Sequence, residues 1–373
     1  MENILFVIDR NFLSNSAVHV HSFANHLALS GFQCIVAVPD GKDSATKLGD
    51  VYYQPIEYKQ IENLPVLYPN GGGPDIIHCW TPREIVRKLC DKLFSLYEFK
   101  LLIHLEDNEE LLTQRFAQTE SLSDTWSHPV RYRDFLNKAD GITVIIEELK
   151  AFVPSDKPTL TLWPGVNFKE FFPRPPSPDL ISKLQLPLNS VVIVYTGNVH
   201  AANATEVRSL YLAVAMLNRE GTPTFLVRTG ENYLDFLGDY GRWVKPYCAE
   251  LGFVDRSQIP EILALADILI QPGKADEFNK YRFPSKLPEF MAMGKPLILP
   301  AVNIGCLLKN GEQAIVLEKA DAINIVEAVK KAIVSQELMH QISDGALKFA
   351  REHFSWEKQS NKLKNFYWEI MSK

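Results

Sequence analysis

Short apolar runs alternate along the chain with longer stretches in which apolar residues recur every three or four positions. Residues 4–8 (ILFVI) are apolar throughout and have the length of a buried strand. Residues 18–30 carry the amphipathic repeat of a helix, which we expect to end at Gly31, because glycine adopts the left-handed cap easily. The next run, 34–38 (CIVAV), again has strand length. This order is typical of βαβ units, in which helices cover both faces of a parallel sheet.

The same order of elements starts again after a proline-rich stretch at 171–178 (FFPRPPSP). The second series opens with a strand-like run at 191–197 (VVIVYTG) and a helical stretch at 207–221. We therefore predict an α/β protein with two doubly wound, Rossmann-like domains joined near residues 173–178. The predicted parts are an N-terminal domain (1–172), a C-terminal domain (179–350) and a C-terminal helix (351–373).

Composition and charge narrow the classes of function. A length of 373 residues favours two domains, since one domain has about 150 residues. Forty-five acidic and thirty-nine basic side chains give a net charge of −6, which argues against nucleic acid as a partner. The five cysteines lack paired spacing, which argues against disulfides and a zinc site and fits a reducing cytoplasm. No signal-peptide pattern or membrane-span-length apolar run is visible, so we expect a cytoplasmic protein, at most peripheral at the inner face of the membrane.

In open α/β sheets, ligands bind outside the carboxyl ends of the strands, where loops and helix amino termini converge. In the second domain this rule selects 197–198, 228–231, 272–274 and the helix that opens within 282–296 (RFPSKLPEFMAMGKP). We expect Ser285 to be the N-cap, so that the following N–H groups and Lys286 form a phosphate site. Glu289, three residues further along, shares the face of Lys286 and suits two vicinal ribose hydroxyls. The alternative is a surface ion pair of these two residues, worth about 0.3 kcal/mol.

Four parts of the chain resemble, in order, the motifs of glycosyltransferase family 4, whose members have the GT-B fold. The matching stretches are 139–152 with 162–173, then 251–272, 283–298 and 354–371. The resemblance implies two facing Rossmann-like domains with a cleft between them, and a last helix, about 356–371, that packs back on the first domain. It also implies transfer of a hexose from a nucleotide diphosphate sugar, most often a UDP-sugar, to a saccharide hydroxyl. The family usually acts with retention and without a metal, so no metal and no cofactor are expected.

The donor side departs from the family pattern at three positions. Tyr281 stands where the family has a first glutamate, while Asn198 and approximately Asn203 stand where it has a diphosphate-binding arginine and lysine. A leaving diphosphate needs compensating positive charge. The available basic residues are Arg228, Lys274, Arg282 and Lys286. We favour Arg228, for which the alternative is a strand-end pair with Glu231.

His104 ends a strand-like run (LLIHL), where the family has a histidine that contacts the donor sugar. The alternative is a strand-end histidine with a satisfied hydrogen bond. If the reaction inverts, Asp107 or Glu109 is the candidate base. The complete expected sets are catalytic His104, Arg228, Lys286 and Glu289; donor-binding Gly197, Asn198, Gly230, Glu231, Val254, Lys274, Tyr281, Arg282, Ser285 and Leu287; and acceptor-binding Ser16, Ala17, His78, Asp107 and Glu109.

Two other functions fit the same fold, a catalytically silent sugar-nucleotide-binding protein and a nucleotide-sugar epimerase.

Residues 83–100 add a second open question, because their sequence predicts a basic amphipathic helix. Such a helix either covers the sheet, with its lysines in water, or lies on an anionic leaflet. In the second case the acceptor is a lipid-linked saccharide, used in polysaccharide or glycoconjugate synthesis.

Overall fold

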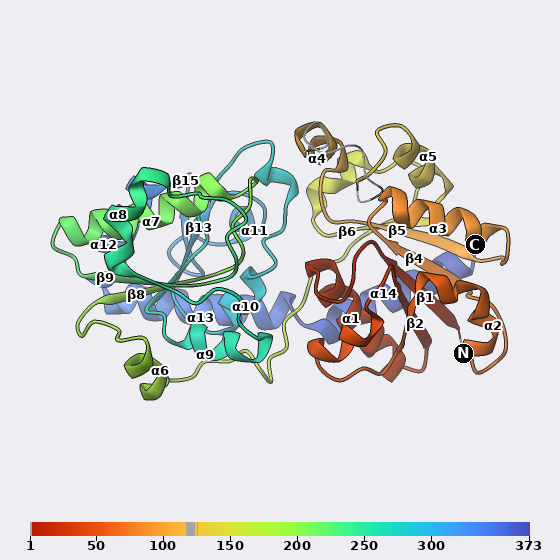
Figure 1. Cartoon of the computed structure of the whole chain (residues 1–373), viewed down its shortest axis with the longest axis horizontal. Helices are drawn as coiled ribbons and strands as arrows, with labels where there is room; N and C mark the ends of the chain where they lie inside the picture. Colours follow the sequence, from red (N-terminus) through yellow and green to blue (C-terminus); the bar gives the residue numbers. More distant parts are fainter. Residues whose placement is uncertain (1, 117–123, 125) are drawn as a thin grey trace. The chain divides into compact units, whose positions relative to one another are not determined.

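The computed structural model describes residues 2–116, 124 and 126–373. These residues divide into two compact units. The first unit comprises Met1–Gly165, Tyr281–Phe283 and Trp356–Lys373, and the second comprises Val166–Lys280 and Pro284–Ser355. Each unit is an α/β layer structure of its own, with helices on both faces of a parallel sheet (Figure 1).

The first unit is built on a seven-stranded parallel sheet in the order β3-β2-β1-β4-β5-β6-β7. Its strands are β1 (Asn3–Ile8), β2 (Gln33–Val38), β3 (Gln54–Glu57), β4 (Ile76–Trp80), β5 (Lys100–Leu105), β6 (Gly141–Val144) and β7 (Thr159–Thr161). Its helices are α1 (Asn15–Leu29), α2 (Leu64–Leu67), α3 (Glu84–Phe94), α4 (Glu109–Phe116), α5 (Arg131–Lys138) and α14 (Trp356–Met371). The strand order reverses between β1 and β4, which is the point where such sheets bind ligands.

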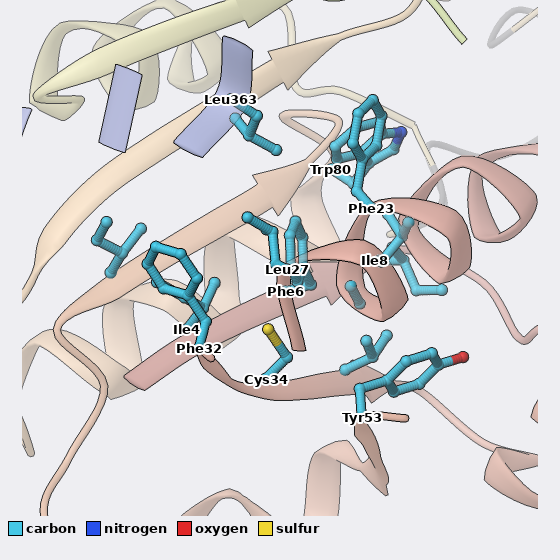
Figure 2. Packing of buried hydrophobic residues seen from close by; sticks show 14 of the residues in the cluster. Ile4, Phe6, Ile8, Phe23, Leu27, Phe32, Cys34, Tyr53, Trp80 and Leu363 are labelled. Carbon is cyan, nitrogen blue, oxygen red and sulfur yellow. The ribbon is translucent and has the colours of Figure 1, made fainter. Parts of the chain in front are cut away.

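Helices α1 and α14 cover one face of this sheet and pack against each other. All six residues of β1 are buried, as expected for a central strand covered on both faces. Figure 2 shows Ile4 and Phe6 of β1 packed with Leu27 of α1 and Leu363 of α14. The apolar run and the amphipathic repeat therefore meet in one core.

The last helix approaches the sheet at a glycine. A Cβ built on Gly141 in β6 would lie 2.9 Å from Ile370 Cδ1, so a larger residue at 141 would displace α14. A Cβ built on Gly165 would likewise lie 2.6 Å from the ring of Trp356. These contacts place the C-terminal helix in the core of the first unit.

The second unit is built on a six-stranded parallel sheet in the order β10-β9-β8-β11-β13-β14, with a separate antiparallel pair β12-β15. Its strands are β8 (Val191–Thr196), β9 (Thr224–Thr229), β10 (Cys248–Glu250), β11 (Ile268–Ile270), β12 (Gly273–Lys274), β13 (Leu297–Pro300), β14 (Ile315–Leu317) and β15 (Lys319–Ala320). Its helices are α6 (Pro178–Lys183), α7 (Ala204–Arg219), α8 (Gly241–Val244), α9 (Ile259–Ala264), α10 (Leu287–Ala292), α11 (Ile304–Leu307), α12 (Ala322–Ile333) and α13 (Gln336–His353). Helices α7 and α12 cover one face, and α9, α10 and α13 lie on the other (Figure 1).

The units divide at Gly165 rather than in the proline-rich stretch 173–178. Phe171 is buried, and Arg174 Nη1 donates to Glu261 Oε1 at 2.6 Å within the second unit. These contacts and the division into units place the stretch within the second unit. At the other end, residues 351–355 belong to the second unit and only α14 to the first.

Candidate functional site

Two glycines bring the ends of β8 and β9 together. Gly197 follows β8 with φ +139°, and Gly230 follows β9 with φ +103°. A Cβ on Gly230 would lie 2.4 Å from the carbonyl group of Gly197, so only glycine fits there. The backbone N–H of Glu231 donates to Asn198 Oδ1 at 2.8 Å and joins the two loops. Four of the predicted donor residues therefore lie at one strand-end corner.

The Lys286 ammonium lies against this corner. Its Nζ donates to Tyr195 Oη at 2.9 Å and stands 4.2 Å from the centroid of the same ring. A Cβ on Gly197 would come within 3.0 Å of Nζ. The missing side chain at 197 thus leaves space beside a full positive charge.

Glu289 is paired with an arginine that the sequence did not point to. Arg256 Nη2, from a 3₁₀ turn after β10, donates to Glu289 Oε1 at 2.6 Å. The carboxylate of Glu289 raises the pKa of Arg256. The ion pair between Lys286 and Glu289 that the spacing allowed is not among the ion pairs of the described residues.

The helix start differs from the prediction. Ser285 is not the N-cap of α10, because Lys286 occupies that position and makes no side-chain cap bond. The N–H of Leu287 donates to Pro284 O at 2.9 Å, and Pro288 has no N–H to offer. The expected anion site therefore depends on the Lys286 ammonium and not on the N-terminus of this six-residue helix.

Arg228, which was predicted to face the diphosphate from a strand end, is buried and held by partners within the second unit. Its side chain is 1% exposed, and Nη2 donates to Glu250 Oε2 at 2.9 Å and to Asn232 Oδ1 at 2.6 Å. Nη1 donates to the Gly197 carbonyl at 3.1 Å. The guanidinium therefore ties β10 to the loop after β8, and it is a positioning residue. The alternative partner, Glu231, makes no ion pair with it among the described residues.

Four other predicted donor residues are exposed, half-buried or part of the first unit. Lys274 is 61% exposed, with Nζ 3.5 Å from Asp276 Oδ2, and Val254 is half-buried in the loop after β10. Tyr281 and Arg282 belong to the first unit, although they were expected in the second domain. Packing explains this placement, since the Tyr281 ring meets Phe152 edge-on at 4.9 Å between centroids.

In the first unit, a carboxylate that is 13% exposed gathers polar groups at the ends of β4 and β5. Glu106 accepts a hydrogen bond from Trp80 Nε1 at 2.7 Å and pairs with His19 Nδ1 at 2.9 Å. It also accepts a short hydrogen bond from Ser16 Oγ. Burial opposes ionisation of Glu106, but the hydrogen bond and charge of His19 and the other partners outweigh it and lower the pKa to about 2. Ser16, predicted to bind the acceptor, thus joins α1 to this carboxylate.

Ala17, predicted to bind the acceptor, lies in the first turn of α1. Ser14 is the N-cap, and its Oγ accepts a hydrogen bond from the Ala17 N–H at 3.3 Å. The Ala17 side chain is buried in the core. Neither its side chain nor its N–H is therefore open to an acceptor, in contrast to the prediction.

His104 is fully buried at the end of β5. Its ring stacks on Trp80 with 3.8 Å between centroids, and Nδ1 lies 2.7 Å from Thr143 Oγ1. Nε2 has no hydrogen-bond partner among the described residues. Burial lowers the pKa of His104 to about 3, so the ring is neutral at ordinary pH. His78 is also buried, between Thr143 Oγ1 at 2.9 Å and Tyr367 Oη at 2.8 Å, so it does not line an open acceptor surface as predicted.

The predicted acidic residues after β5 lie beside Arg83. Glu109 accepts a hydrogen bond from Ser127 Oγ at 2.6 Å, and its Oε2 lies 3.8 Å from Arg83 Nε. Burial raises the pKa of Glu109 to about 7 and also raises that of Asp107. Asp107 faces Arg282 at 3.9 Å. One carboxyl group in this cluster therefore titrates near neutrality.

Residues 190–334 match the family model described as "Glycosyl transferases group 1". The match covers less than half of the chain. The matched range contains the corner of Gly197 and Gly230 as well as Arg256, Lys286 and Glu289. No curated protein sequence matches the chain.

Solved structures with similar folds cover almost all of the chain. Sucrose-phosphate synthase from Thermosynechococcus elongatus aligns over 100% of both chains, with a TM-score of 0.75 and 15% identity. HepE from Anabaena, in complex with UDP, aligns over 99% of this chain and 100% of its own, with a TM-score of 0.74 and 16% identity. A glycosyltransferase from Rickettsia africae aligns over 99% of both chains, with a TM-score of 0.74 and 15% identity. These similarities show the fold: the chain has the GT-B fold, and the matched range 190–334 lies almost wholly in the second unit.

Sequence reasoning missed three polar residues, Arg256 beside Glu289, and Glu106 and Thr143 beside His104. Arg256 lies in a short charged stretch without a recognisable spacing. Glu106 lies two residues after His104, and its place at a strand end was the available signal. Thr143 stands inside an apolar strand, where a lone threonine is ordinary.

The basic residues of 83–100, which an anionic leaflet would have to contact in the membrane alternative, are all paired with carboxylates. Helix α3 ends at Phe94, so Lys100 belongs to β5. The pairs are Arg83–Asp9 at 2.8 Å, Arg87–Glu84 at 2.7 Å, Lys88–Asp124 at 2.8 Å, Lys92–Glu62 at 2.6 Å and Lys100–Asp140 at 3.5 Å. These pairs offset the positive charge and favour the interpretation of α3 as a covering helix.

In the described part of the chain, no helix combines the length and apolar character needed to cross a membrane. Within the same residues, no group of three or more His, Cys, Asp and Glu side chains is arranged to hold a metal ion.

Proposed function

We propose that the protein is a glycosyltransferase that moves a hexose from a nucleotide diphosphate sugar, preferably a UDP-sugar, to a hydroxyl of a saccharide acceptor. The observation that carries this proposal is the Lys286 ammonium beside Gly197, within the range that matches the group 1 family model. We assign this ammonium to the diphosphate and Glu289 to the ribose.

Lys286 is suited to an anion because its charge is not already neutralised. Its hydrogen-bond acceptor is the neutral phenol of Tyr195, and it forms no ion pair among the described residues. Charge-assisted bonds to phosphate are stronger than bonds to a neutral phenol. Replacing the phenol of Tyr195 by a diphosphate as the hydrogen-bond acceptor of Lys286 is therefore favourable.

Glu289 is suited to a diol because one of its oxygens is held and the other is open. Oε1 accepts from Arg256 at 2.6 Å, which fixes the carboxylate, while Oε2 makes no hydrogen bond within the described residues. The side chain is 13% exposed. A ribose hydroxyl can donate to Oε2 without displacing Arg256.

In the first unit, the neutral ring of His104 offers Nε2 to a sugar oxygen, as the family resemblance implies. In a retaining transfer the bond from the anomeric carbon to the phosphate oxygen breaks, and a bond to the acceptor oxygen forms. The acceptor proton passes to the departing phosphate, so no protein base is needed. Glu109, whose burial raises its pKa to about 7, is the candidate base if the reaction inverts.

The donor class is supported by the solved structures of HepE, whose titles name UDP, UDP with glucose, and UDP-glucose. The five unpaired cysteines agree with a reducing cytoplasm as the place of action. A lipid-linked acceptor at a membrane surface is the weaker form of the proposal, because the charges of α3 are paired.

A panel of sugar nucleotides tests the proposal. We expect one donor to raise the melting temperature, to be hydrolysed slowly and to transfer its sugar to a saccharide. A thermal shift without turnover would instead identify a silent binding protein, and an epimerised sugar nucleotide would identify an epimerase. No shift with any donor would overturn the proposal.

A further inference from the structure

Four fully buried side chains of the first unit form a continuous hydrogen-bonded chain from the C-terminal helix to His104. Tyr367 Oη of α14 lies 2.8 Å from His78 Nδ1, and His78 Nε2 lies 2.9 Å from Thr143 Oγ1. The same Thr143 oxygen lies 2.7 Å from His104 Nδ1. All four residues are 0% exposed, so water does not compete for these bonds. They come from α14, β4, β6 and β5.

The chain has only two consistent hydrogen arrangements, because each neutral imidazole has one N–H and each hydroxyl donates one hydrogen. Both histidines are neutral, since burial lowers the pKa of His78 and of His104. In one arrangement Tyr367 donates to His78, His78 Nε2–H donates to Thr143, and Thr143 donates to His104 Nδ1. In the other, His78 Nδ1–H donates to Tyr367, Thr143 donates to His78 Nε2, and His104 Nδ1–H donates to Thr143.

The second arrangement leaves the phenolic hydrogen of Tyr367 without an acceptor. His78 Nδ1 is the one hydrogen-bond partner of Tyr367 Oη among the described residues. A buried hydroxyl hydrogen without a partner carries the full cost of desolvation. The first arrangement satisfies this hydrogen and leaves His104 Nε2–H unpaired among the described residues instead. It is favoured because a phenol is a strong donor and a weak acceptor, whereas a bare imidazole nitrogen is a strong acceptor, and it ends with the proton of His104 on Nε2.

We propose that Tyr367 is a positioning residue that sets the tautomer of His104 through His78 and Thr143, so that His104 Nε2–H is a hydrogen-bond donor. Trp80 stacks on the ring, which Thr143 holds at Nδ1, and Glu106 accepts the indole N–H. Nε2–H is then the polar group of the ring that has no hydrogen-bond partner among the described residues.

The tautomer of His104 decides which groups of a ligand can form a hydrogen bond with Nε2. A fixed Nε2–H donates to a ligand oxygen that has no hydrogen of its own, whereas a bare Nε2 requires a ligand hydroxyl. Under the proposed function, on which this step rests, the ligand is the donor sugar. The tautomer itself does not depend on that function.

Nitrogen NMR of the whole protein with ¹⁵N-labelled histidine tests the inference, because protonated and bare ring nitrogens resonate far apart. We expect wild-type His104 to be the Nε2–H tautomer throughout pH 6–8. Tyr367→Phe removes the terminal hydroxyl, so we expect a mixture of both His104 tautomers. Thr143→Val breaks the chain and should also give a mixture, whereas Thr143→Ser keeps a hydroxyl and should preserve the wild-type tautomer.

Tyr53→Phe is the matched control. Tyr53 Oη lies 3.0 Å from His21 Nδ1 in the same unit, outside the chain that ends at His104. This variant should leave the His104 signals unchanged. The inference is overturned if wild-type His104 carries its proton on Nδ1, or if a folded Tyr367→Phe protein keeps the wild-type tautomer.

Kinetics separate this inference from the proposed function. For an active transferase, Tyr367→Phe should lower kcat by about tenfold or less, the scale of one hydrogen bond, with little change in KM. A protein without turnover would refute the proposed function, while the NMR result would still decide the role of Tyr367.

Discussion

Lys286 Nζ donates to the phenolic oxygen of Tyr195 at 2.9 Å, while Glu289, one turn further along, pairs with Arg256 at 2.6 Å. The two functional groups that the sequence places on one helix face are therefore held by different partners. This separation allows the ammonium and the carboxylate to bind different parts of one ligand. It also makes their contributions separable by mutation.

Lys286→Ala should reduce kcat by about 100-fold and weaken donor binding much less. Negative charge on the leaving diphosphate grows in the transition state, so the loss of its partner appears mainly in the rate. Steady-state kinetics together with calorimetric binding measure the two effects. Lys309→Ala is the control, since this exposed lysine pairs with Glu312 at 3.5 Å and lies outside the proposed site. Equal losses in rate and binding would show uniform binding instead.

Glu289→Ala should abolish the thermal shift given by the UDP-sugar donor. A ligand that binds the native state stabilises it by mass action, and the ribose contact contributes to that affinity. Glu261→Ala is a matched control, because it also removes a carboxylate paired with an arginine, Arg174, at 2.6 Å in the same unit. An undiminished shift in Glu289→Ala would contradict the assignment of the ribose.

Arg228→Ala should lower the free energy of unfolding by about 1–3 kcal/mol, because hydrogen bonds to charged groups are lost and Glu250 keeps a partly buried charge. Denaturant titration measures this loss. Donor binding by the fraction that remains folded should change little. A fully stable variant with a selective loss of turnover would instead restore Arg228 as a partner of the diphosphate.

Glu109→Gln should flatten the pH dependence of stability. Burial raises the pKa of Glu109 to about 7, from an ordinary value of 4.5, so the folded state favours the protonated group. The stability from this preference is complete below pH 4.5 and is lost as pH rises through 7. Relative to wild type, the variant should therefore gain up to about 3 kcal/mol between pH 4.5 and pH 8.

Chemical denaturation at several pH values measures this effect. Glu110→Gln on the same helix is the control, because the pKa of Glu110 is lowered rather than raised. That variant should show no such gain as pH rises. The assignment fails if both variants follow the wild-type profile.

At low salt, sedimentation with vesicles of anionic lipid should pellet no more protein than sedimentation without anionic lipid. The basic residues of α3 are paired with carboxylates, so few positive groups are left for a leaflet. Sedimentation measures this directly. Lipid-dependent pelleting that Arg87→Glu with Lys88→Glu removes would show that α3 binds membranes.

Hydrophobic patterns along the sequence predicted the helices and strands well where burial alone determines the element. The apolar run 4–8 lies within β1, and the repeat 18–30 lies almost wholly within α1, because burial follows directly from hydrophobic periodicity. The GT-B fold also followed from motif order. The expected cap at Ser285 failed because Leu287 and the prolines around it set a different helix start.

The side-chain partners in the site were less predictable. Arg228 was expected to meet the diphosphate because it stands at a strand end, but its partner Glu250 lies 22 residues away and is brought beside it by the pairing of β9 with β10. The link from Tyr367 to His78 spans 289 positions. Such contacts depend on tertiary packing, which no local spacing encodes.

Helix α14 completes the core of the first unit with residues from the end of the chain, where Ile370 packs over Gly141. During synthesis, the first unit therefore stays unfinished on the ribosome until the whole second unit has been made. Its apolar surface over α1 and β6 remains uncovered for that time, and transiently exposed apolar surface of this kind favours aggregation.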